Sequence, residues 1–166
     1  MILKVLNDDG SAIHGSGLWH MPHGNRPGKW MPAIADLRPC ESGYHMIESA
    51  EALLEWLGPV IWIAEARGRR IEKSPGVGVW EQARLIRRVE TWNERTARLF
   101  ACDCAERVAH LDPSGQAVKT IEVARRYSEG KATQEELSAA RSAARSAARS
   151  AAWSAARSAA ESAAGS

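Results

Sequence analysis

The sequence predicts an α+β protein, in which a small mixed α/β domain over residues 1–91 precedes an all-helical region over residues 92–166. Three observations support this fold class. Six of the seven prolines lie before residue 76, and glycine is also concentrated in the first half. The clearest strand pattern, residues 60–66, lies there too. After about Trp92 the chain consists almost entirely of helix-forming residues and ends in an alanine-rich run.

The first part of the chain is expected to combine a short strand with a long loop. Residues 2–6 are an apolar stretch typical of a strand, and Asn-Asp-Asp-Gly at residues 7–10 predicts the turn that closes it. Residues 11–39 contain four glycines and four prolines. They should therefore form loops, with Trp19 and Trp30 covering an edge of the core.

One helix and two further strands are expected before residue 92. Residues 48–57 have a helical pattern that Gly-Pro at residues 58–59 ends. Residues 60–66 are almost continuously apolar, which predicts a central strand that Gly68 ends. The apolar positions of residues 77–90 fit either a helix or a strand, and we prefer the strand.

The second half should form three helices. The first, over about residues 93–111, is amphipathic, and the second, over about residues 116–129, ends at Gly130. Cys102 points away from Cys104 on the first helix, and we interpret it as a small buried or half-buried residue rather than a reactive thiol. The apolar residues that share the expected core face of the first helix are Ala97, Ala101, Cys104, Val108 and Leu111.

The third helix is expected over about residues 134–164. Thr133 and Glu136 have the spacing of a capping box, in which each side chain accepts a hydrogen bond from the other residue's amide. From Ser138 the sequence repeats Ser-Ala-Ala followed by a variable residue. Because alanine has the highest helix propensity, a run of this length predicts a stable helix.

The arginines of this repeat do not form a constant face. Each residue turns by about 100°, so a four-residue repeat advances about 40° beyond a full turn and spirals around the helix. Three interpretations follow: a largely solvated rod, a surface of small side chains that wraps around a protein partner or a second copy, and a low-complexity extension without function. The residues assigned to such an interface are Trp153, as the large anchor, and Arg141, Arg145, Arg149 and Arg157.

Composition argues against several classes of partner. The 22 basic and 20 acidic residues nearly cancel, so nucleic-acid binding is not expected. No apolar run approaches the roughly 20 residues of a membrane span, and the N-terminal residues lack a secretory signal pattern. The three cysteines are an odd number without a disulfide framework, which favours a reducing compartment. We therefore expect a cytoplasmic protein.

The sequence shows no recognisable catalytic or metal-binding pattern, and no catalytic residue, metal or cofactor is assigned. His20, His23, Cys40 and His45 are ligand types that zinc accepts, but His20 and His23 lie in a loop without a second close pair. Neither a nucleophile elbow nor a glycine-rich phosphate loop occurs. The basic cluster at residues 67–70 is interpreted as solvated.

Residues 94–160 resemble a family of helical immunity proteins of bacteria and phages. The specific part is Cys-Ala-Glu-Arg-Val at residues 104–108, followed by the helix that ends at Gly130 and by an Ala/Arg-rich helix. This resemblance implies a helical module that binds and blocks a partner. It implies no catalytic residue.

The first half is similar, over short motifs, to the ADP-ribosyltransferase fold. His14-Gly15-Ser16 resembles the first His-Gly-Ser motif of that fold, and residues 41–45, followed by a helix, resemble its second motif around Tyr44. The resemblance implies that His14 holds a ribose and that Tyr44 stacks on a nicotinamide ring. Where it requires a catalytic glutamate, residues 74–77 read Ser-Pro-Gly-Val.

Three functions are compatible with these features. The leading hypothesis is a non-enzymatic interaction protein of a phage or mobile element, which uses the helical half to bind a partner or itself and the first half for recognition. The alternative is a nucleotide-binding module that sequesters a signal derived from NAD or ADP-ribose. The third hypothesis is an active ADP-ribosyltransferase.

Overall fold

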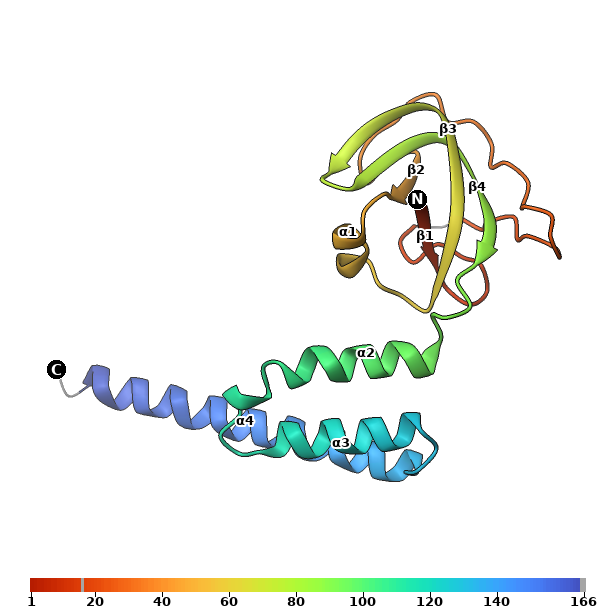
Figure 1. Ribbon diagram of the computed structural model, residues 1–166. Coiled ribbons are helices and arrows are strands. Elements are labelled where there is room, and N and C mark those ends of the chain that lie inside the picture. Colours follow the sequence, from red (N-terminus) through yellow and green to blue (C-terminus); the bar gives the residue numbers. More distant parts are fainter. Residues whose placement is uncertain (16, 165–166) are drawn as a thin grey trace. The chain divides into compact units, whose positions relative to one another are not determined.

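The protein has an α+β fold, and the computed structural model describes residues 1–15 and 17–164 (Figure 1). The chain divides into two compact units, Met1–Asn93 and Glu94–Ser166. We refer to these as the barrel unit and the helical unit. The first unit ends two residues after the boundary predicted at residue 91, because its last strand leads into a short turn before the first helix of the second unit.

Four antiparallel strands form the barrel unit and close on themselves in the order β1-β2-β4-β3. β1 lies where expected, and β4 confirms the strand preferred for residues 77–90, whereas β2 was not predicted. The strands are β1 (Ile2–Leu6), β2 (Tyr44–Ile47), β3 (Val60–Ser74) and β4 (Val77–Arg88).

β3 continues well beyond the end expected at Gly68. Gly68 has a φ of +81°, and the register between β3 and β4 shifts between Arg67 and Arg70, so the strand bulges and then resumes pairing. The Arg69 amide donates to Glu81 Oε2 at 3.0 Å, which satisfies a backbone group near the bulge. The expected end was wrong because β4 continues to supply hydrogen bonds past the glycine.

The loop between β1 and β2 is held along β4. Three amides of residues 28–34 donate to carbonyl oxygens of residues 81–85 at 2.8 to 3.0 Å. On β4, β2 pairs only with residues 77–80, so the loop occupies the same edge of β4 after β2 ends. In the first part of the same loop, the Trp19 amide donates to Gly10 O at 3.1 Å, and Trp19, which is 5% exposed, packs against the core as expected.

Alternate residues of β1 pack into different hydrophobic clusters. Leu6 lies in a cluster that includes Trp19 and Met31 from the long loop. Leu3 and Val5 lie in a second cluster, which α1 covers. The strand therefore has two buried faces, which explains why its sequence is apolar almost throughout.

The helix that covers the second cluster, α1 (Ala50–Glu55), is shorter than the helix expected over residues 48–57. Ser49 lies before it in an extended conformation, and the Ala52 amide donates to Ser49 Oγ at 3.1 Å. Ser49 is thus the N-cap rather than part of the helix. Trp56 ends α1 with a non-helical backbone.

The barrel is weakly closed between β1 and β2. β1 pairs with β3 over five residues but with β2 only at Leu3 and Ile47. Beyond that pair the backbone ladder stops, and Lys4 Nζ donates to His45 O at 3.1 Å across the gap. We call this opening, where residues 4–6 face residues 44–46, the seam.

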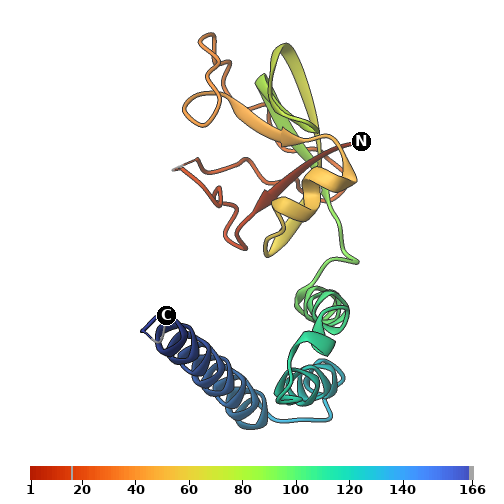
Figure 2. The same cartoon turned by 90° about the vertical axis from the view of Figure 1, so that its left-hand side faces the viewer.

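The helical unit contains three α-helices among the described residues, and α3 contacts both of the others (Figures 1 and 2). Arg125 of α3 joins it to α2 through ion pairs with Asp103 at 2.7 Å and with Glu106 at 2.8 Å. The helices are α2 (Glu94–Glu106), α3 (Gln116–Ser128) and α4 (Gln134–Ala164).

The core face predicted for the first helix is wrong. α2 ends at Glu106, and the chain tightens into a 3₁₀ turn, Ala109–Leu111, so the helical phase is lost before residue 108. Within α2 itself, Cys102 rather than Cys104 faces α3, where its Sγ lies 3.9 Å from Ile121 O, so Cys102 is 5% exposed and Cys104 is exposed. Among the other residues assigned to that face, Val108 and Leu111 are largely exposed.

The beginning of α4 is fixed by the expected capping box. The Thr133 amide donates to Glu136 Oε2 at 2.6 Å, and the Glu136 amide donates to Thr133 Oγ1 at 3.2 Å. Leu137 is 1% exposed, and its neighbours along the same stripe are partly buried. Every side chain that the structure describes after Ala147 is exposed, so among the described side chains of α4 only those of its first half pack.

Removal of residues 149–166 should leave the packed part of the protein intact. The deleted residues have no described buried side chain, so we expect the thermal midpoint to change by less than about 2 °C. The helical circular dichroism signal should fall in proportion to the residues lost. Differential scanning calorimetry of both chains checks this, and a clear drop in the midpoint would show that the end of α4 is packed.

Candidate ligand-binding pocket

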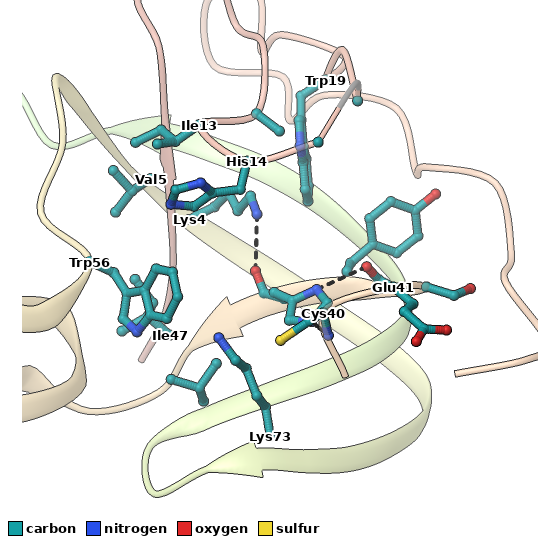
Figure 3. Close-up of a pocket in the computed structure, with 18 of the residues that line it drawn as sticks. Lys4, Val5, Ile13, His14, Trp19, Cys40, Glu41, Ile47, Trp56 and Lys73 are labelled. Carbon is teal, nitrogen blue, oxygen red and sulfur yellow. Dashed lines mark hydrogen bonds between the residues drawn. The ribbon is translucent and has the colours of Figure 1, made fainter. Parts of the chain in front are cut away.

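A pocket of about 760 Å³ opens at the seam of the barrel (Figure 3). Lys4 of β1 and Tyr44 of β2 border it where their strands separate. Residues 12–15, Gly17, Trp19 and residues 40–43 of the long loop form further sides, and Trp56, just after α1, adds another. Because strand pairing stops at Leu3 and Ile47, the pocket follows from the strand register.

Aromatic rings from separate segments meet around this pocket. The rings of Trp19 and Tyr44 lie 5.5 Å apart at 73°, and those of His14 and Trp56 lie 5.8 Å apart at 85°. Both pairs are edge-to-face, the arrangement that the ring quadrupoles favour. They give the pocket apolar sides that suit a flat ring.

Two lysines are directed to the same space. Lys4 Nζ lies 5.2 Å from the centre of the Trp19 ring, and Lys73 Nζ lies 3.9 Å from the centre of the Trp56 ring. Within residues 1–15 and 17–164, neither ammonium forms an ion pair. Lysines without carboxylate partners beside aromatic rings are suited to bind an anion.

The ammonium of Lys4 is largely buried. Burial lowers the pKa of its ammonium from 10.5 to about 8, because the charged form loses hydration. Its hydrogen bond to His45 O uses one of three donors. Further donor capacity is therefore available to an acceptor in the pocket.

His45 has a structural role at the edge of the pocket. Its Nε2 accepts from the Cys40 amide at 2.8 Å, so its Nδ1 carries the proton and faces Gly43 O at 3.3 Å. Burial lowers the pKa of His45, and the charges of Lys4 and Lys73 lower it further. The neutral ring thus holds Cys40, whose φ is +66°.

Gly43 positions the tyrosine that follows it. Its φ is +110°, and a Cβ at this position would collide with the side chains of Val79 and Leu37. The hydroxyl of Tyr44 donates to Pro32 O at 2.8 Å, and burial raises its pKa. This hydrogen bond fixes the ring at the side of the pocket.

Three of the four residues proposed from the transferase-like motifs line this one pocket: His14, Gly15 and Tyr44. The fourth, Ser16, lies outside the described residues. The residues proposed for the helical interface lie in the other unit, where Trp153 is 76% exposed. The four arginines assigned with it, Arg141, Arg145, Arg149 and Arg157, are also exposed.

The zinc-type residues are not gathered into a metal site. Among the described residues, no group of three or more His, Cys, Asp or Glu side chains could hold a metal ion. Cys40 and His45 lie together, but His45 Nε2 is used by the Cys40 amide. His20 and His23 do not line the pocket.

Sequence reasoning missed Lys4, Lys73 and Trp56. The sequence did contain one indication for Lys4. Side chains alternate along a strand, so Lys4 lies on the same face as Ile2 and Leu6, and a lysine on a buried apolar face is rare enough to suggest a functional role. Lys73 and Trp56 carried no such signal. They reach the pocket only through the full length of β3 and the backbone change at the end of α1.

The chain matched no protein family, no curated protein and no solved structure with which it was compared. No helix within the described residues is long and apolar enough to cross a bilayer.

Proposed function

We propose that the protein is a non-enzymatic binding protein whose barrel holds a small, anionic, ring-bearing ligand of the nucleotide class. The observation that carries this proposal is the convergence of Lys4 and Lys73 on a pocket with aromatic sides. The volume of about 760 Å³ falls in the range of small-molecule sites. The pocket residues His14, Gly15 and Tyr44, which resemble transferase motifs, support the same ligand class.

The polar groups of the pocket support binding better than group transfer. His45 is held by backbone groups on both ring nitrogens, and the Tyr44 hydroxyl is held by Pro32 O. Glu41 pairs with Arg38 at 3.7 Å. These three groups stabilise the loop that forms the pocket, whereas the lysines remain available to a ligand.

Calorimetry of the full chain with ADP-ribose, AMP and adenosine tests the proposal. We expect ADP-ribose and AMP to bind and adenosine, which lacks phosphate, to bind at least about tenfold more weakly. Lys73→Ala should weaken AMP binding by about tenfold, whereas Lys29→Ala, an exposed lysine outside the pocket, should not. Absence of heat with all three compounds, or equal AMP binding in both variants, would refute the proposal.

A second candidate function is self-association through α4. It is supported by Trp153, a large side chain that is 76% exposed on a helix surface of small residues, and by the resemblance of this unit to helical immunity proteins. Sedimentation velocity across a concentration series should show a dimer that Trp153→Ala weakens. A monomer at every concentration would exclude this candidate.

A further inference from the structure

The position and the hydrogen-bond partners of Lys4 are not needed in a lysine that only attracts an anion through its charge. Its side chain begins on β1 and ends in the pocket (Figure 3). In the described part of the chain, the ammonium donates to one protein acceptor, His45 O, and forms no ion pair. Lys73, in contrast, lies directly over the Trp56 ring.

We propose that Lys4 binds a carbonyl compound covalently, as a reversible imine with the aldehyde of an anionic ligand held in the pocket. This inference rests on the proposed function, because the same pocket must first bind the ligand. Lys73 would bind the negative group, and Lys4 Nζ would attack the aldehyde carbon. The ligand class is therefore a phosphorylated sugar or nucleotide with a free reducing end.

The reaction is balanced without any further reactant. The neutral Lys4 amine adds to the aldehyde carbon to give a carbinolamine, in which a C–N bond has formed. The former carbonyl oxygen then leaves as water with the two hydrogens of the amine, and a C=N bond remains. No oxidant or reductant is consumed, and water reverses the reaction.

The surroundings of Lys4 favour the neutral amine that this addition requires. With a pKa of about 8, about one amine in ten is neutral at pH 7, compared with about one in three thousand at the ordinary value of 10.5. His45 O accepts one N–H, which orients the amine. The nitrogen lone pair is then free to meet a ligand in the pocket.

Reductive trapping of the full-length protein tests the inference. The protein is incubated at pH 7 with ADP-ribose, whose terminal ribose opens to an aldehyde, in the presence of cyanoborohydride. We expect one adduct by intact mass, located at Lys4 by peptide mapping and formed at least about tenfold faster than at any other lysine. NAD, in which the same anomeric carbon is blocked, should give none.

Two variants provide the controls. Lys4→Arg keeps the positive charge but should lose the adduct, whereas Lys29→Arg should react like the unmodified protein. Equal labelling of several lysines, or an adduct that persists in Lys4→Arg, would overturn the inference. ADP-ribose binding in calorimetry without an adduct would refute the imine alone, and absence of both would refute the proposed function as well.

Discussion

Replacement of Lys4 by methionine should raise the free energy of unfolding of the barrel unit at pH 7 by about 1–3 kcal/mol. The wild-type ammonium is buried at the seam without an ion-pair partner in the described part of the chain, and its pKa is lowered to about 8. Methionine has a similar length and no charge, so it can occupy the same space beside Trp19. The same variant should lose AMP binding. A gain in stability with a loss of binding is typical of a residue retained for function.

Urea unfolding followed by tryptophan fluorescence measures this effect. Six of the seven tryptophans lie in the barrel unit, so the signal reports mainly on its unfolding. Lys29→Met is the matched control, because Lys29 is exposed and outside the pocket, and its substitution should change stability by less than about 0.5 kcal/mol. A clear destabilisation by Lys4→Met would contradict the cost assigned to the buried charge.

The difference between the two proteins should depend on pH. Because the folded-state pKa of Lys4 lies below the unfolded value of 10.5, the unfolded chain binds more protons between about pH 8 and 10.5. The stability contribution of Lys4 therefore rises with pH across that window. Below pH 8 both states are protonated, and the full cost is present. The advantage of Lys4→Met should thus be greatest at neutral pH and shrink towards pH 10.5.

The parts of the fold that the sequence predicts well are those decided by local interactions. The long helix begins at its capping box and runs to the expected end, because alanine propensity and the cap act within a few residues. β2 was missed because a four-residue strand between turns gains its stability from pairing with β4, 30 to 36 residues away. The strand end predicted at Gly68 was wrong for the same reason, since pairing with β4 outweighs the local preference of a glycine to end the strand.

The site was predictable only in part. The motifs around His14 and Tyr44 identified two sides of the pocket, although these residues are 30 positions apart in the sequence. The lysines that give the pocket its charge come from β1 and from the end of β3, and no local pattern connects them. The strand register that separates β1 from β2 after one residue pair creates the space between them. A register of this kind depends on the whole sheet.

Leu137→Ala should have the largest effect in the helical unit. Leu137 is 1% exposed and is the largest fully buried side chain of this unit, so its truncation should cost about 2–4 kcal/mol. Few other residues of the unit are buried, among them Cys102, Ala109 and Ser128. Because the core of this unit is so small, the loss is a large fraction of the free energy that holds its helices together. We therefore expect α4 to separate from α3 in a substantial fraction of molecules.

The two consequences of this substitution can be measured separately. Because α4 is rich in alanine, it should remain largely helical after it separates, so circular dichroism should change little. Hydrogen exchange should accelerate at residues 134–147, where packing protects the backbone, and at the facing residues of α3, which include Thr120. Trp153→Ala, on the exposed part of the same helix, should leave this exchange unchanged in the monomer. Unaltered protection at residues 134–147 in Leu137→Ala would mean that alanine contacts alone hold α4 against α3.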